Sequence, residues 1–116
     1  MSLWKYNNVE LEVDMEDADF QEKYENAFLR MEQTEVELAK VGNLSQVTRD
    51  YCKMFYQLFD DIFGDRIGDK LFNGKHNIRL IDEAYSSFID HCKKEVDAIN
   101  KRRANMVSKY KVNKKR

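Results

Sequence analysis

The stretch SQVTRDYCKMFYQLFDDIF (residues 45–63) carries apolar residues at the three- and four-residue spacing of a helix. They form two neighbouring rows, Val47, Tyr51, Met54, Phe55, Leu58 and Ile62 in one and Cys52, Tyr56, Phe59 and Phe63 in the other. At about 100° per residue the rows cover more than half of the helix circumference. Other elements must then contact this helix on two sides. It is predicted to be the central helix of a bundle.

A second principal helix is predicted before this stretch. It begins near Asp17 or Asp19, because acidic residues favour the first turn of a helix, and it stops at Gly42-Asn43. Its apolar stripe is Phe20, Tyr24, Ala27, Phe28, Met31, Leu38 and Val41.

A short helix and a long one are predicted after the central helix. The short helical turn lies between Gly64 and Gly74, and its apolar residues can plug the end of the core: Ile67, Leu71 and Phe72. Asn77 is the expected N-cap of the long helix. The apolar stripe of that helix is Ile78, Ile81, Ala84, Tyr85, Phe88, Ile89, Cys92, Val96 and Ile99, with a weaker continuation through Met106, Val107 and Tyr110.

The first fourteen residues are predicted to form a β-hairpin. Asn7-Asn8 can adopt the positive φ values of a two-residue turn. This turn makes Tyr6 face Val9, Trp4 face Leu11 and Lys5 face Glu10. A lone hairpin is marginal in water, so its apolar face must pack on the helices.

These elements predict one mainly α domain, a hairpin packed on three principal helices and one short helix. The absence of proline and the presence of only four glycines favour long helices. A last helix from Asn77 to Tyr110 would be roughly 50 Å long, longer than the diameter of about 35 Å of a domain this size. We therefore expect a bundle over residues 1–99 and a basic helical extension over residues 100–116.

Charge is divided unevenly along the chain. Up to Cys92 there are 19 acidic and ten basic side chains, whereas residues 93–116 hold ten basic and two acidic ones. The formal net charge of −1 therefore describes a dipolar molecule, which can attract partners of either sign at opposite ends. This pattern favours a protein that binds partners over an enzyme. The predicted binding residues of the extension are Lys101, Arg102, Arg103, Met106, Val107, Lys109 and Tyr110.

No catalytic residue, cofactor or metal site is predicted. Cys52 and Cys92 lie on apolar helix faces, which favours buried thiols over a disulfide. His91 points about 100° away from Cys92, so the two cannot easily share a metal. Asp60 and Asp61 fall on the polar arc of the central helix, where a solvated face is expected. The chain has neither a signal segment nor an apolar run of roughly 20 residues, so we expect a cytoplasmic protein with no membrane partner.

Four blocks carry a family resemblance: DADFQEKYE (17–25), FDDIFG (59–64), KLFNGKHN (70–77) and EAYSSFI (83–89). Their succession resembles the tail assembly chaperones of long-tailed phages and prophages of Gram-positive bacteria. The resemblance implies a helical, non-enzymatic, self-associating protein that binds the tape-measure protein and helps to recruit tail-tube subunits. It implies a location in the cytoplasm of the bacterial host and absence from the mature virion.

A tape-measure helix would need an apolar groove. The candidate groove residues are Phe55, Phe59, Phe63, Leu71 and Phe72, although core packing is the better explanation for most of them. Two other functions remain open. One is a small nucleic-acid-binding or packaging accessory protein that uses the basic extension, and the other is a structural head–tail connector component.

Overall fold

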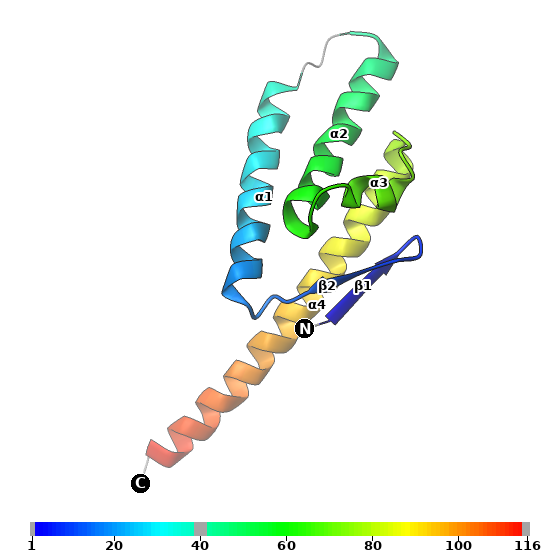
Figure 1. The fold of residues 1–116 in the computed structure, drawn as a ribbon. Helices are drawn as coiled ribbons and strands as arrows, with labels where there is room; N and C mark the ends of the chain where they lie inside the picture. Colours follow the sequence, from blue (N-terminus) through cyan, green and yellow to red (C-terminus); the bar gives the residue numbers. More distant parts are fainter. Residues whose placement is uncertain (1, 39–41, 115–116) are drawn as a thin grey trace.

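The computed structural model describes the backbone of residues 2–38 and 42–114, and the side chains of this part as far as residue 109. The elements follow in the order β1 (Ser2–Tyr6), β2 (Val9–Val13), α1 (Ala18–Glu37), α2 (Leu44–Phe63), α3 (Ile67–Phe72) and α4 (Ile78–Lys114). The two antiparallel strands lie against the helices at the N-terminal end of the chain (Figure 1). The predicted mainly α fold with an N-terminal hairpin is confirmed.

α2 is the central helix, as predicted. Its N-cap is Asn43, whose side chain accepts a hydrogen bond from the backbone N–H of Gln46. Six of its side chains are buried: Cys52, Met54, Phe55, Leu58, Phe59 and Ile62. α1, α3 and α4 all pack against it, which explains why its apolar arc is so wide.

α1 starts as predicted but ends early. Asp17 is its N-cap and accepts a hydrogen bond from the backbone N–H of Phe20. The predicted end at Gly42-Asn43 is wrong, because the backbone turns extended at Leu38. Val36 is 87% exposed, so the last turn gains little from packing, and Asn43 caps α2 instead. The predicted stripe residue Val41 lies outside the described residues.

The hairpin has the predicted register. Tyr6 pairs with Val9, Trp4 with Leu11 and Lys5 with Glu10, and both turn asparagines have positive φ. Trp4 is only 2% exposed. Its ring lies 5.6 Å from that of Phe59 and 5.1 Å from that of Phe88, so one aromatic residue joins the hairpin to α2 and α4.

α3 closes one end of the core through Leu71 and Phe72, which are almost fully buried. It packs very closely on α2. A Cβ atom at Gly68 would lie 3.0 Å from the Cα atom of Tyr56 and 2.9 Å from a ring carbon of the same residue. Glycine is therefore required at this crossing.

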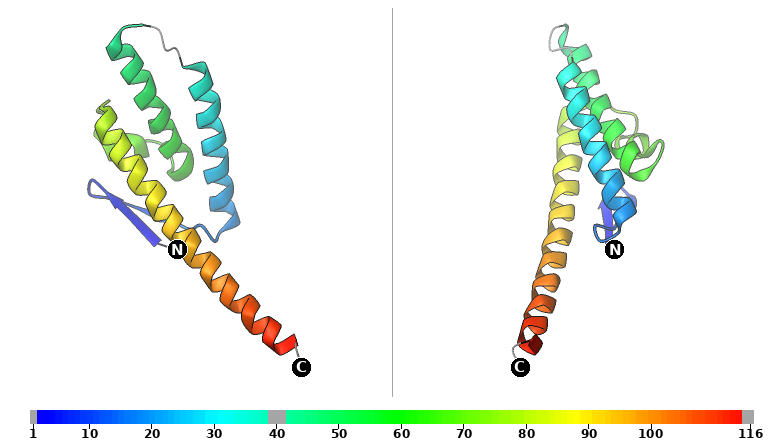
Figure 2. Two further views of the ribbon diagram at one scale, coloured as in Figure 1. Left: turned by 180° about the vertical axis from the view of Figure 1, so that it is seen from behind. Right: turned by 90° about the vertical axis from the view of Figure 1, so that its left-hand side faces the viewer.

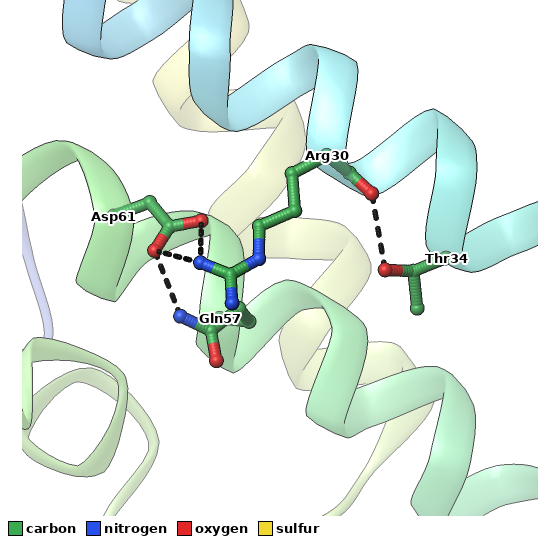
Figure 3. Close-up of polar contacts among 4 residues, drawn as sticks. All are labelled: Arg30, Thr34, Gln57 and Asp61. Carbon is green, nitrogen blue, oxygen red and sulfur yellow. Dashed lines mark hydrogen bonds and ion pairs between the residues drawn. The ribbon is translucent and has the colours of Figure 1, made fainter.

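Two aspartates that were expected to face solvent hold elements together instead. Asp60 accepts a hydrogen bond from the backbone N–H of Gly68 at 2.8 Å, which fixes the start of α3. Asp61 forms an ion pair with Arg30 of α1 at 3.0 Å and accepts a hydrogen bond from Gln57 at 2.8 Å (Figure 3). The prediction of a purely solvated face is wrong, since α1 and α3 both approach this arc of α2.

α4 is much longer than the bundle. Asn77 is its N-cap, as predicted, since its side chain accepts hydrogen bonds from the backbone N–H groups of Arg79 and Leu80. At 37 residues the helix is about 55 Å long, in a molecule that measures 69 × 31 × 22 Å. Its last turns extend beyond every other element (Figure 2). None of the helices in the described part of the chain has the length and apolar character needed to cross a membrane.

Candidate functional site

The five predicted groove residues lie in or beside the core. Phe55, Phe59, Leu71 and Phe72 are at most 5% exposed, and Phe63 is half-buried. The neighbours of α2 cover both of its apolar rows, so these side chains do not line an open groove. The groove is therefore not formed, and these residues have the core role that the sequence favoured for most of them.

The predicted binding residues of the extension are exposed as far as the side chains are described. All side chains from 101 to 109 are exposed. Met106 and Val107 stand out because they are apolar and still 63% and 53% exposed. Arg102 contacts the bundle through an ion pair with Glu16 at 2.5 Å. The side chain of Tyr110 lies outside the described part. We call residues 104–114, which follow the last bundle contacts, the arm.

A row of half-buried apolar side chains, which the sequence did not single out as a site, lies between α1 and α4. We call Tyr24, Phe28, Met31 and Tyr85 the aromatic seam. The ring of Phe28 lies 4.6 Å from that of Tyr24 and 6.3 Å from that of Tyr85. In α1 only Ala27 is fully buried, so this helix rests on the bundle largely through partly exposed rings.

The tyrosines of the seam lie in a partly dry environment. Burial raises the pKa of Tyr24, with Cys92 and Tyr85 adding to the effect. Burial also raises the pKa of Tyr85, with a contribution from Glu35. The sequence could have indicated the seam through the tyrosines at positions 24 and 85. A tyrosine hydroxyl usually reaches water or a polar partner even when its ring packs inside.

The seam leads into a cleft at the point where α4 leaves the bundle. This junction cleft has a volume of about 300 Å³ and is lined by Met15, Gln21, Tyr24, Glu25, Val96, Ile99, Asn100 and Arg103. Val96 and Ile99 are half-buried. The cleft thus combines apolar side chains with one acidic and one basic residue, a lining suited to another polypeptide.

A polar cluster ties the hairpin to α4 beside this region. Glu95 accepts a hydrogen bond from the backbone N–H of Met15 at 2.5 Å and another from the hydroxyl of Ser2. The same hydroxyl lies 2.7 Å from Nε2 of His91. We call Ser2, His91 and Glu95 the hairpin latch. No sequence pattern indicates this cluster, because its members come from opposite ends of the chain.

The latch contains serine, histidine and a carboxylate, but its geometry differs from that of a catalytic triad. In a triad the carboxylate orients the histidine, which takes the proton of the serine. Here Glu95 contacts the hydroxyl of Ser2, so the serine rather than the histidine lies in the middle of the cluster. The geometry indicates a structural cluster.

The two cysteines and the possible metal ligands are the other candidate functional groups. Cys52 and Cys92 are buried, as predicted, and burial, together with the nearby Glu95, raises the pKa of Cys92 to about 12. Its thiol stays protonated near neutral pH and is a poor nucleophile or ligand. Among the described side chains, no group of three or more His, Cys, Asp or Glu residues is placed to hold a metal ion.

The comparisons with known proteins yield a family. No curated protein and no solved structure matches the chain. One family model does, and its match covers nearly the whole chain. Over residues 7–116 the chain matches the model of a family of unknown function, DUF6673, and it therefore belongs to that family.

Proposed function

We propose that this protein is a non-enzymatic assembly factor that binds a helical segment of another polypeptide. The observation that supports this best is the continuity of three features: the aromatic seam, the junction cleft and the arm. Half-buried rings beside a cleft offer the apolar contact area that an amphipathic helix needs. The charged residues at the cleft, Glu25 and Arg103, can orient such a helix.

The resemblance to phage tail assembly chaperones gives the partner a proposed identity. The partner would be the tape-measure protein, whose long helices expose apolar stripes before the tail assembles, with tail-tube subunits recruited afterwards. The chaperone would act in the bacterial cytoplasm, would self-associate and would be absent from the virion. A head–tail connector component, by contrast, would be found in purified virions.

Co-expression with the tape-measure protein of the same tail gene cluster tests this proposal. We expect the wild-type chain to keep the tape-measure protein soluble and to co-purify with it. Phe28→Ser and the milder Met31→Ser should reduce this recovery, because both remove apolar area from the seam. Leu29→Ser is the matched control, since Leu29 is the next residue of the same helix and is already 55% exposed.

Melting curves must first show that the seam variants are folded. The proposal fails if folded Phe28→Ser and Met31→Ser chains both recover as much soluble tape-measure protein as the control. It fails equally if the gene lies in no tail cluster.

Binding to nucleic acid is the second candidate function, and the exposed basic side chains of the last helix are the observation that supports it. Lys101 and Lys109 are exposed, and residues 93–116 hold ten basic side chains. Against this, Tyr110 is the only aromatic residue after position 99 that could stack on a base. A gel shift at modest salt decides between the two: binding that falls steeply with salt and is lost on truncation after Ile99 supports this function, and no shift removes it.

A further inference from the structure

We infer that the junction cleft receives the arm of a second copy of this chain, so that two copies pair through antiparallel arms. The inference deepens the self-association in the proposed function: it names the occupant of the cleft in the isolated chain, before a tape-measure helix binds there. It rests on three observations: the side of the helix on which the arm has its apolar residues, the presence of the cleft, and the acidic charge beside the cleft that faces a basic arm.

The apolar face of the arm continues the side of α4 that lines the cleft. At about 100° per residue, Val107 and Met106 fall on the same side of the helix as Val96 and Ile99. The latter two are half-buried in the cleft, whereas Met106 and Val107 are 63% and 53% exposed. One helix face is therefore covered at its base and uncovered about two turns later.

The charges select a second copy in the antiparallel orientation. The arm and the turn before it carry only basic charges on their described side chains, among them Lys101 and Lys109. Acidic exposed side chains surround the start of α1 next to the cleft: Glu16, Asp17, Asp19, Glu22 and Glu25. An antiparallel pair brings each basic arm towards the acidic region of the other copy, whereas a parallel pair would place two basic arms together.

One contact of this kind already exists within the chain. Arg102 reaches Glu16 at 2.5 Å where the helix leaves the bundle. Asp19, Glu22 and Glu25 are exposed near the cleft, so they can meet basic groups from outside. An arm from a second copy would thus add further contacts between basic side chains and the acidic start of α1, of the kind that Arg102 and Glu16 form within one chain.

The two-fold arrangement also closes on itself. Each copy offers one arm and one cleft, so the pairing satisfies both copies at once and leaves no site for a third. The arm spans about 16 Å beyond Arg103. Two helices that cross near that residue therefore bring Met106 and Val107 of each copy beside the cleft residues Val96 and Ile99 of the other.

The first test measures the dimer directly. We expect the full chain to sediment as a concentration-dependent dimer that weakens at high salt. The double variant Met106→Ser and Val107→Ser should raise the dissociation constant by at least about tenfold, since it removes apolar contact area without changing charge. Val36→Ser is the control, because Val36 is 87% exposed on α1 and lies far from the cleft in the chain. A monomer at about 100 μM, or a double variant that dimerises like wild type, overturns the inference.

The second test fixes the geometry. Chains with only Val107→Cys are mixed with chains that carry only Gln21→Cys, so that a disulfide between these two positions can form only between copies. We expect this mixed dimer to form at least about tenfold faster than the one between Val36→Cys and Gln21→Cys. If Val107→Cys chains instead cross-link mainly to each other, the arms are parallel and the proposed arrangement is wrong. Either negative result leaves the tape-measure test of the proposed function unaffected.

Discussion

Single residues decide how closely the elements approach one another. Gly68 allows α3 to lie directly on α2, Trp4 joins the hairpin to two helices, and Asp60 fixes the start of α3. None of these roles follows from hydrophobic periodicity, which treats a glycine as a gap and an aspartate as a surface residue. Each becomes visible only when the partner atom is known.

Gly68→Ala tests the closest of these approaches. The added methyl group would meet the backbone of Tyr56 at 3.0 Å, and backbone cannot rotate away as a side-chain end can. We expect a loss of about 1–3 kcal/mol in the free energy of unfolding, measured by urea denaturation. Lys70→Ala in the same short helix is the control. Equal stability of the two variants would show that α3 can shift without cost.

Alkaline pH tests the hydroxyl of the half-buried Tyr56. Burial, followed by the effects of Asp69 and Cys52, raises its pKa from 10.0 to about 12, and its hydroxyl donates to the carbonyl of Lys75 at 2.7 Å. A group whose pKa is raised on folding contributes stability below its unfolded pKa and loses that contribution as pH rises through the folded value. We therefore expect the free energy of unfolding to fall between about pH 10 and pH 12.

Tyr56→Phe provides the comparison for this pH dependence. It should cost about 0.5–1.5 kcal/mol at pH 8, because one hydrogen bond is lost, and its stability should fall less steeply above pH 10 than that of wild type. The pKa values of Tyr6, Tyr24, Tyr51 and Tyr85 are also raised by burial, so part of the decline remains. Parallel curves for the variant and wild type would contradict the role assigned to Tyr56.

At the scale of elements, the hairpin is held to α4 by the hairpin latch, and Glu95→Gln tests that attachment. The neutral amide would weaken both hydrogen bonds that Glu95 accepts, from Ser2 and from the backbone of Met15. We expect a loss of about 1–3 kcal/mol. Trp4 is the only tryptophan, so its fluorescence reports release of the hairpin separately from the helical circular dichroism. Asp97→Asn serves as the control, since Asp97 is exposed on the same helix.

The sequence was sufficient for local features of the elements and insufficient for their surfaces. The hairpin register, the start of α1 near Asp17, the cap residue Asn77 and the central position of α2 depend on nearby residues, and all were predictable. The end of α1 was not, because it is set by how little of its last turn packs. The expected groove failed for a related reason: periodicity identifies an apolar row such as Phe55 and Phe59 but does not reveal whether another helix covers it.

At the scale of the whole molecule, the bundle covers only the first part of α4 and leaves the last turns exposed. Truncation of the chain tests where the bundle ends. The sequence placed this boundary after residue 99, yet Arg102 binds Glu16 and Arg103 lines the junction cleft. We expect a chain that ends at Arg103 to melt within a few degrees of the full chain, because every side chain described beyond it is exposed. A chain that ends at Ile99 should melt lower, since it loses the ion pair and part of the cleft wall.

The same two truncations separate folding from assembly. The chain that ends at Arg103 keeps the cleft but lacks the arm, so it should be folded and monomeric at concentrations where the full chain is a dimer. Melting by circular dichroism and mass by sedimentation give the two readings independently. If removal of residues 104–116 lowers the melting temperature as much as removal of 100–116, the arm contributes to the stability of its own bundle. It would then be part of the folded core and would no longer be free to reach a second copy.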